Sequence, residues 1–546
     1  MAPAEDWVVR TAEQVRAEAA RRHPGRPPTC ASGISPSGPV HLGNLRELMV
    51  PHLVADQVRR DGAECRHILS WDDYDRFRRV PAGYPESFAE HIGRPLTAVP
   101  DPCGEHENWA EHFKDPLRDA LARLGIRVTE VSQTQMYTSG AYTDQIILAM
   151  RRRSDIQSVL TRYQTKRSGD PEDDGDPRAA AAYYPFKPYC AICGRDDTTV
   201  TAFDDDTTEI SYTCACGAAI GPVPIAEVAG KLVWKVDWPM RWAYEHVTFE
   251  PAGVDHSSPG SSFTVGGELV SEIFGGEMPL HFAYSFVGTS GSAKMSGSRG
   301  GAPTPADALE IFEAPLLRWL YARRRPEQSI TLAFGDEVGR VYDEWDKLTR
   351  QVADGEADPL KQAIWARSAG TAEGLLPVTP RPLPFRTLAS VADITAGDEV
   401  QMLRIVRDLT IGDPVSSLDE VRPRLDCAQA WVAEYLAPQE RTRVRSEPDV
   451  AQLAALSDED RGALKLLTEG MSTDWSLEGL TTLLYGIPKL QRGLTIDAKP
   501  TDEIKKAQRA WFILLYRLLI GKDTGPRLPT LLLAVGQDRI RTLLTP

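Results

Sequence analysis

A strand, a turn and a helix between residues 29 and 60 constrain the fold of this chain most strongly. Residues Thr29–Ile34 predict a buried strand, and the amphipathic run from about residue 41 to residue 60 predicts a helix. The intervening Ser-Pro-Ser-Gly-Pro breaks the strand into a turn. Because backbone amides and the helix dipole point toward such a turn, the junction is a natural site for a phosphate.

The first helical turn carries two polar side chains that can reach a bound nucleotide. His41 and Asn44 are three residues apart, so they lie on one face of the helix. Residues 36–44 match neither the P-loop spacing nor Gly-x-Gly-x-x-Gly, and instead read Pro-Ser-Gly-x-x-His-x-Gly-Asn. The sequence therefore predicts a nucleotide site of another kind.

Strands and helices alternate in the first part of the chain. Further strands are predicted at residues 65–71, 126–131 and 281–287, and helices at 12–22, 108–124 and 141–167. This alternation predicts an α/β fold with a parallel sheet, whose ligands bind at the carboxyl ends of the strands. A polar loop at residues 168–178 precedes a cysteine-bearing insert at about residues 185–225.

Strand signals disappear after about residue 325. Helical segments such as 423–436 and Asp502–Ile520 are separated by proline-rich linkers, which predicts an all-α domain. We therefore expect a catalytic domain at residues 1–325 and a helical domain at 326–546. A length of 546 residues is consistent with two to four domains.

Composition and charge restrict the class of protein. The formal net charge of −15 argues against indiscriminate nucleic-acid binding, but it leaves room for a local basic surface. An acidic enzyme without a nucleic-acid partner is the alternative. The start of the chain does not resemble a signal peptide, and its most apolar run, at 511–520, is too short to cross a bilayer. We expect a cytoplasmic protein with no membrane partner.

A second phosphate-binding element is predicted at residues 292–300, Ser-Ala-Lys-Met-Ser-Gly-Ser-Arg-Gly. A Gly/Ser-rich loop that bears Lys294 and Arg299 can fold over a triphosphate and supply amides, hydroxyls and positive charge. Alone, such a segment is better explained as a solvated loop. Following the first motif in chain order, it becomes much more specific.

The two elements together resemble the HIGH and KMSKS motifs of class I aminoacyl-tRNA synthetases. Five segments resemble the archaeal-type class I lysyl-tRNA synthetases, namely residues 30–47, 71–78, 235–242, 255–261 and 521–529. The resemblance implies a Rossmann-like catalytic domain with a zinc-binding insert, followed by an α-helical anticodon-binding domain. It further implies ATP-dependent activation of L-lysine, with Mg²⁺ on the triphosphate, and transfer of lysine to tRNA(Lys).

The resemblance also implies which residues bind ATP. His41 and Asn44 would hold the nucleotide, and Lys294 with Ser296 would close over its phosphates. The full ATP-binding set is Ser37, Gly38, His41, Gly43, Asn44, Lys294, Met295 and Ser298. The loop departs from the family at Gly297, where many synthetases carry a second lysine, so Lys294 and Arg299 would supply the cationic role.

Lysine recognition requires a site for the α-amino acid and a distal site for an ammonium group, which carboxylates and an aromatic face serve well. Gly33 and Ser35 are candidates for the substrate backbone. The pocket candidates are Asp73, Trp238, His256 and Tyr284. The structural alternatives are core aromatics for Trp238 and Tyr284, and a helix cap for Asp73.

Two clusters have the chemistry of metal ligands. Cys190-x-x-Cys193 and Cys214-x-Cys216 are two tight thiolate pairs that predict a structural Cys₄ zinc site. A weaker cluster consists of Asp101, Glu105, His106 and His112, with Cys103 two residues before the position where the family has its cysteine. Ordinary surface residues at a helix start are the alternative for this second cluster.

A basic stripe on the predicted helix 141–167 is a candidate for contact with the tRNA acceptor stem. It contains Arg151, Arg152, Arg153, Arg162, Lys166 and Arg167. A solvated helix face is the alternative. For the whole chain, the competing functions are another class I synthetase of glutamyl or glutaminyl type, a non-catalytic tRNA-binding paralogue, and a small-molecule nucleotidyltransferase.

Overall fold

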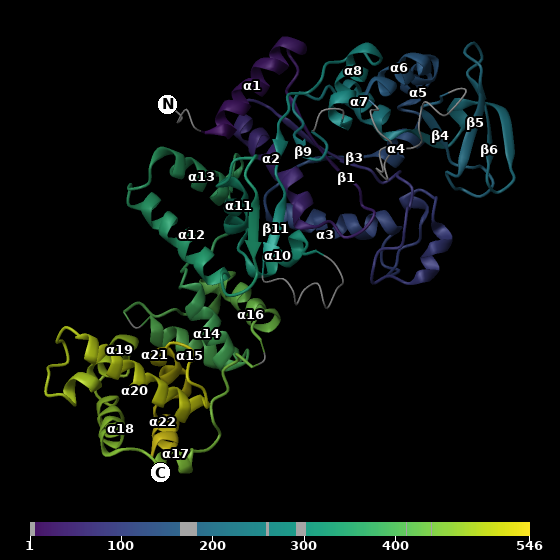
Figure 1. Cartoon of the computed structure of the whole chain (residues 1–546). Helices are drawn as coiled ribbons and strands as arrows, with labels where there is room; N and C mark the ends of the chain where they lie inside the picture. Colours follow the sequence, from purple (N-terminus) through teal and green to yellow (C-terminus); the bar gives the residue numbers. More distant parts are fainter. Residues whose placement is uncertain are drawn as a thin grey trace. The chain divides into compact units, whose positions relative to one another are not determined.

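The computed structural model describes residues 6–163, 183–257, 261–290, 302–410, 412–437 and 439–545. The chain forms two compact units (Figure 1). The first contains residues up to 309 together with 314–333 and 347–376, and the second contains 310–313, 334–346 and 377–546. The units therefore do not divide at residue 325.

A parallel sheet organises the first unit, as predicted. Strands β1 (Thr29–Ile34), β2 (Arg66–Trp71) and β3 (Thr129–Ser132) pair in the order β1-β2-β3, with Gly33 opposite Ser70. Helices α2 (Leu42–Arg60) and α3 (Trp109–Arg123) follow β1 and β2 along the chain. On the far side of β1, Cys30 forms a parallel bridge to Phe249, which in turn bridges to Leu280. These bridges bring residues near 250 to the edge of β1.

Two further pairs of short parallel strands belong to this unit. Strand β9 (Ala252–Gly253) pairs with β10 (Ala283–Tyr284), and β11 (Val287–Ser290) pairs with β12 (Ile330–Ala333). The expectation that strands end at residue 325 is therefore wrong for β12, a four-residue strand too short to show a period. The pair β13 (Gly370–Thr371) and β14 (Gly374–Leu375) also lies beyond that residue.

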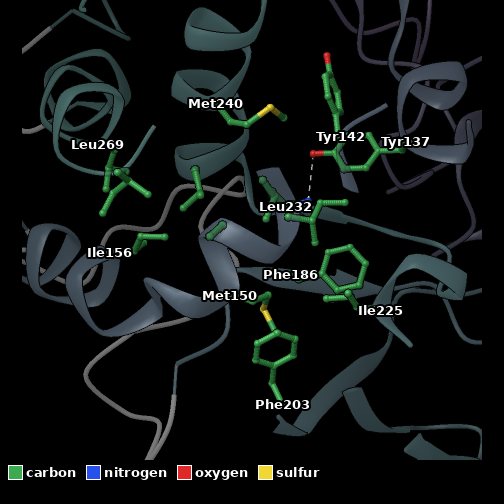
Figure 2. Close-up of a cluster of buried hydrophobic side chains, with 14 of the residues drawn as sticks. Tyr137, Tyr142, Met150, Ile156, Phe186, Phe203, Ile225, Leu232, Met240 and Leu269 are labelled. Carbon is green, nitrogen blue, oxygen red and sulfur yellow. Dashed lines mark hydrogen bonds between the residues drawn. The ribbon is translucent and has the colours of Figure 1, made fainter. Parts of the chain in front are cut away.

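The cysteine-bearing insert is a small antiparallel region. Strand β4 (Phe186–Pro188) pairs with β8 (Gly230–Leu232), and β5 (Thr198–Phe203), β6 (Glu209–Cys214) and β7 (Ala219–Pro224) form a separate sheet. Figure 2 shows the core that joins the insert to α7 (Trp234–Glu245) and α8 (Ser262–Glu272), with Phe186, Leu232 and Met240 among its buried side chains. The Tyr137 hydroxyl accepts a hydrogen bond from the Leu232 amide at 3.2 Å, which fixes the end of β8.

The helix predicted at residues 141–167 is two helices in the structure. They are α5 (Thr143–Arg151) and α6 (Arg153–Tyr163), separated at Arg152, and residues 164–167 lie outside the described residues. The remaining helices of the first unit are α1 (Trp7–Arg22), α4 (Gln133–Thr138), α10 (Pro305–Ile311, ending in the second unit), α11 (Ala314–Ala322), α13 (Pro359–Ala369) and three short 3₁₀ turns, Glu86–His91, Leu96–Ala98 and Ile225–Glu227.

The second unit is helical throughout its described residues, as predicted. Its helices are α14 (Phe385–Thr395), α15 (Glu399–Leu409), α16 (Arg424–Glu434), α17 (Val450–Ala454), α18 (Asp458–Gly470), α19 (Leu477–Leu490), α20 (Asp502–Ile520), α21 (Leu528–Val535) and α22 (Gln537–Leu544), with one 3₁₀ turn at Leu418–Val421; α12 (Val338–Ala353) begins in it. Leu467, Leu484, Leu515 and Leu531 form the centre of its core and are fully buried. Within the described residues, no helix combines the length and apolar character that a membrane crossing needs.

Candidate active site

A cavity of about 240 Å³ opens where β1 and β2 end and α2 begins. Gly33 and Ser35, which end and follow β1, lie on its wall, as do Ser70 and Asp72 at the end of β2. Asn44 from the first turn of α2 also lines it. The predicted position of the site, at the carboxyl ends of parallel strands, is therefore where the structure has its cavity.

The start of α2 is held by its own side chains. Nδ1 of His41 accepts a hydrogen bond from the Gly43 amide at 3.0 Å, and Oδ1 of Asn44 accepts one from the His41 amide at 3.2 Å. A Cβ atom at residue 43 would lie 2.8 Å from the His41 ring, so this position requires glycine. Burial lowers the pKa of His41, which favours the neutral ring. Nε2 of His41 is left available for a ligand.

The rest of the predicted phosphate site lies along the same turn. Ser37 is exposed, and its carbonyl accepts a hydrogen bond from the Trp109 indole at 3.1 Å, which anchors the turn. Gly38 follows it and is half-exposed. The second phosphate element, with Lys294, Met295, Ser296 and Ser298, lies outside the described residues.

Two tryptophans and a glutamate form one wall of the cavity. The indoles of Trp238 and Trp242 donate hydrogen bonds to Oε1 and Oε2 of Glu250, at 3.0 and 2.6 Å. Burial is the main cause that raises the pKa of Glu250 to about 7. His256 also lines the cavity, with its ring 6.3 Å from that of Trp238. The candidates Trp238 and His256 are thus brought together, beside a carboxyl group that sequence reasoning missed.

A second carboxyl group, Glu47, faces the same cavity from α2. It accepts hydrogen bonds from the Gly33 amide at 3.3 Å and from the Tyr284 hydroxyl at 3.2 Å. Burial, with a further contribution from Glu250, raises the pKa of Glu47 to about 8. Within the described residues, neither glutamate forms an ion pair. Tyr284 itself lies behind Glu47 and does not line the cavity.

The structure gives Asp73 a different place from the one expected. Asp73 is fully buried and does not line the cavity. Its carboxylate accepts hydrogen bonds from Lys114 Nζ at 2.7 Å, from Ser132 Oγ at 2.6 Å and from the Thr134 amide at 2.8 Å. These contacts join the end of β2 to α3 and to the end of β3, so Asp73 is a structural residue rather than part of the pocket.

Two cations that line the cavity, Arg241 and Lys231, are paired with carboxylates. Arg241 binds Asp72 at 2.7 Å and also forms an ion pair with Asp237, one helical turn earlier on α7. Lys231 forms an ion pair with Asp75. Because these cations already have carboxylate partners, Glu47 and Glu250 are the carboxyl groups on which a bound cation would act most strongly.

The four cysteines of the insert meet at one point. The Sγ atoms of Cys190 and Cys216 are 3.7 Å apart, as are those of Cys193 and Cys214. All four sulfur atoms lie within 4.8 Å of one another. Four thiolates at this spacing are the ligand set of a tetrahedral structural zinc site.

The second candidate metal cluster is present in the structure, with one ligand different from the set expected from the sequence. Cys103 Sγ lies 3.3 Å from Nδ1 of both His106 and His112, and 3.2 Å from Oδ2 of Asp101. The ligand atoms of these four residues lie within 4.8 Å of one another, and Glu105 is not among them. The expectation for Glu105 is therefore corrected to Cys103, whose thiol turns toward the two imidazoles.

The described part of the basic stripe is already paired. Arg153 and Arg151 donate to the Asp205 carboxylate and carbonyl at 2.7 and 3.1 Å. Arg152 pairs with Asp155, and Arg162 with Glu268 at 2.9 Å. These partners neutralise much of the positive charge that the sequence suggested.

Comparisons with known proteins found a family model, curated relatives and solved structures similar to this chain. The family model described as "tRNA synthetases class I (K)" matches residues 5–371. A lysine–tRNA ligase of Streptomyces coelicolor is 58% identical, with 99% of this chain and 98% of that protein covered. A lysine–tRNA ligase of Pyrococcus horikoshii is 34% identical, with 93% of each chain covered. Among solved structures, a glutamate tRNA ligase from Elizabethkingia meningosepticum has a TM-score of 0.43 at 11% identity, covering 95% of this chain and 98% of that chain.

Proposed function

The chain belongs to the family of class I tRNA synthetases (K), and from that premise we propose that it ligates L-lysine to tRNA(Lys) in two steps. In the first, a carboxylate oxygen of lysine attacks the α-phosphorus of ATP, and pyrophosphate leaves. In the second, a hydroxyl of the terminal ribose of the tRNA attacks the adenylate carbonyl, and AMP leaves. The protein acts by positioning and by electrostatic stabilisation.

The observation that supports lysine as the substrate is the pair of carboxyl groups without a cation, Glu47 and Glu250. A lysine ε-ammonium is a compact cation that needs carboxylates and gains from an aromatic face. Both carboxyl groups lie beside Trp238 in one small cavity. A site for a glutamate side chain would instead require a cation in the place of these two carboxyl groups, and a bound carboxylate would be repelled by them.

The amino-acid end of the substrate fits the end of β1. The backbone of Gly33, and the backbone and hydroxyl group of Ser35, line the cavity within reach of the α2 start. We assign them to the α-amino and carboxylate groups of lysine, with His256 on the same wall. Tyr284 acts through Glu47, whose carboxyl group its hydroxyl holds. This arrangement aims the substrate carboxylate at the phosphate site.

The ATP end is assigned to the α2 start, because the positive end of the helix dipole attracts a phosphate. Nε2 of His41 and the side-chain NH2 group of Asn44 are the groups that hold the nucleotide, with the turn at Ser37, Gly38 and Gly43 around it. Lys294, Met295, Ser296 and Ser298 are proposed to cover the phosphates. Mg²⁺ bound to the triphosphate would neutralise its charge as the α-phosphate is attacked.

Zinc is proposed as a structural ion held by Cys190, Cys193, Cys214 and Cys216. Asp101, Cys103, His106 and His112 supply a second ligand set that suits the same metal. Neither cluster lies on the cavity wall, so the metal stabilises the fold and takes no part in the reaction. The remaining partner is tRNA(Lys), and we place the reaction in the cytoplasm, without a membrane partner.

Exchange of radiolabelled pyrophosphate into ATP tests the assignment. The purified protein is assayed with lysine, glutamate, glutamine and arginine, each with and without tRNA(Lys). Exchange driven by lysine above the other amino acids is expected. Exchange driven by glutamate and not by lysine would overturn the proposal, and loss of all exchange and all charging would favour a non-catalytic tRNA-binding protein.

A further inference from the structure

Arg46 is a buried arginine on α2, next to Glu47 in the chain. Its side chain is 2% exposed, and burial lowers the pKa of its guanidinium. An arginine nevertheless stays charged in a protein. Within the described residues, each hydrogen bond that this guanidinium donates ends on a backbone carbonyl, and none ends on a carboxylate. A buried cation of this kind is costly unless other groups satisfy its donors.

The Arg46 guanidinium holds two separate segments of the first unit against α2. Its Nη1 donates to the Ser285 carbonyl at 2.7 Å, and its Nη2 lies 2.8 to 3.1 Å from three carbonyls of the turn at residues 325–328. The two segments also bind each other, because the Ser285 amide donates to the Pro326 carbonyl at 2.9 Å. An arginine suits this arrangement, since it has five N–H donors in a planar fork whereas a lysine has three on one atom.

The residue before Ser285 is Tyr284, which ends β10 and holds Glu47. Its hydroxyl donates to Oε2 of Glu47 at 3.2 Å. Two consecutive residues of α2 therefore contact two consecutive residues of the facing segment, Arg46 through the Ser285 backbone and Glu47 through the Tyr284 side chain. The Tyr284 ring also lies 6.0 Å from Cζ of Arg46. Arg46 thus fixes the place of the Tyr284 hydroxyl relative to Glu47.

We propose that Arg46 is a positioning residue for lysine activation, an inference that depends on the proposed function. By binding the Ser285 carbonyl, it keeps the Tyr284 hydroxyl within hydrogen-bond distance of Glu47. That hydrogen bond favours the ionised carboxylate, which the lysine ammonium requires. Arg46 does not line the cavity, so it acts on the substrate through Tyr284 and Glu47.

The groups that face Glu47 determine how the loss of Arg46 should appear. Burial raises the pKa of Glu47 most, and the carboxyl groups of Glu250 and Asp72 raise it further. The Gly33 amide and the Tyr284 hydroxyl lower it, because both donate to the carboxylate. A displaced Tyr284 should therefore raise the pKa of Glu47 and weaken lysine binding together.

The first test compares Arg46→Lys with a matched control, Arg318→Lys, in pyrophosphate exchange. Arg318 is also fully buried and donates to backbone carbonyls, those of Leu124, Arg367 and Gly370, none of which lines the cavity. Arg46→Lys should raise the KM for lysine about ten-fold and leave the KM for ATP unchanged, as expected when a charged group loses one good hydrogen bond.

The control should lower the unfolding temperature as Arg46→Lys does, but it should keep the parent KM for lysine. If Arg46→Lys does not fold, Arg46→Gln is measured in its place with the same expected result, because it buries no charge and still offers two donors. An unchanged KM for lysine at residue 46, or an equal rise in the control, would overturn the proposal.

A double-mutant cycle tests whether Arg46 acts through Tyr284. Tyr284→Phe removes the hydroxyl that holds Glu47, and it should itself raise the KM for lysine about ten-fold. Adding Arg46→Lys to Tyr284→Phe should then raise the KM no further. Two effects that multiply would show that Arg46 acts independently of Tyr284, which contradicts the proposal.

The pKa of Glu47 separates this inference from the proposed function, because it is measured without lysine. Protein labelled with ¹³C at the glutamate side-chain carboxyl carbons is titrated by NMR, and the Glu47 resonance is identified by its loss in Glu47→Gln. Arg46→Lys should raise this pKa by about one unit, the same ten-fold factor, and Arg318→Lys should not change it. If the parent protein fails to activate lysine, the proposed function fails, yet this titration still decides the inference. An unchanged pKa of Glu47 in Arg46→Lys would refute it.

Discussion

Glu47→Gln is the substitution that bears most directly on substrate choice. Glutamine has nearly the size of glutamate, and its single oxygen can still accept the hydrogen bond from the Gly33 amide, while its NH2 group can donate to the Tyr284 oxygen in place of the bond that Oε2 accepts. It removes the capacity for negative charge while it keeps a polar contact to both neighbours. Any loss in lysine activation therefore reports the attraction between this side chain and the substrate cation.

The expected loss in lysine activation follows from the attraction between the buried Glu47 carboxylate and the lysine ammonium. Two unit charges 4 Å apart attract by about 4 kcal/mol at an effective dielectric constant of about 20. Part of this attraction remains in Glu47→Gln, because Glu250 lies in the same cavity and the glutamine side chain keeps a polar contact. We expect a net loss of about 3 kcal/mol, which corresponds to a fall of about 150-fold in kcat/KM for lysine.

The charge argument also predicts a pH dependence. The carboxyl groups of Glu47 and Glu250 have pKa values raised to about 8 and about 7, so without lysine Glu47 is mostly protonated and Glu250 is about half protonated at neutral pH. A bound ammonium requires them ionised. The KM for lysine should therefore fall as pH rises from 6 to 8.5 in the parent protein, and this fall should be smaller in Glu47→Gln.

The raised pKa of Glu47 also affects folding stability, which falls as pH rises whereas lysine binding strengthens. In the unfolded chain Glu47 ionises near its ordinary pKa of about 4.5, whereas the folded protein holds the proton until about pH 8. Folding stability is therefore lost as pH rises between these values. Without lysine, Glu47→Gln should unfold at a higher temperature than the parent at pH 8.5, and at the same temperature at pH 4.5.

Pyrophosphate exchange at varied lysine concentration and pH measures the fall in kcat/KM and the pH dependence of the KM for lysine. Thermal unfolding measures the pH dependence of stability. Glu245→Gln is the control, because Glu245 also lines the cavity but is bound by Arg66 at 2.7 Å. It should change the KM for lysine less than five-fold, as expected of a side chain outside the ammonium site. The reasoning is refuted if Glu47→Gln keeps its kcat/KM for lysine, or if the control loses as much.

Three further predictions follow from the same structure. Asp73→Asn should lower the free energy of unfolding by about 2 kcal/mol, because the buried Lys114 ammonium loses one of its two carboxylate partners and keeps only Glu111, with an unchanged KM for lysine in the protein that remains folded; urea titration and exchange assays check both. Metal analysis should find two zinc ions per chain, one of which Cys103→Ala loses and Glu105→Gln keeps, and equal zinc content in these two variants would contradict the corrected ligand set. Gly43→Ala should raise the KM for ATP at least ten-fold, since its methyl group would displace the His41 ring, and an unchanged KM would argue against that ring as a nucleotide ligand.

Much of the fold could be predicted from the sequence where the periodicity is strong. Strand β1 and helix α20 begin and end at the predicted residues. The prediction of a single helix at 141–167 was wrong, because the continuous apolar pattern does not show the break at Arg152. Strand β12 was missed because four residues are too few to establish a period.

The pocket was predicted less well than the fold, for a physical reason. Glu47 lies one turn beyond Asn44 on α2, so its spacing held a signal that was not used. Glu250 follows no motif, and it reaches the cavity only because Phe249 pairs with Cys30 at the edge of β1. Asp73 was misassigned because sequence does not show that three donors already surround its carboxylate.

Charging of tRNA(Lys) in direct competition between amino acids tests the central claim most directly. The purified protein is incubated with ATP, Mg²⁺, tRNA(Lys) and equal concentrations of lysine, glutamate and glutamine, and the esterified amino acid is identified by mass spectrometry of the tRNA 3′ end. The account predicts lysyl-tRNA alone from the parent protein and its near loss from Glu47→Gln. Glutamyl- or glutaminyl-tRNA as the product would contradict it.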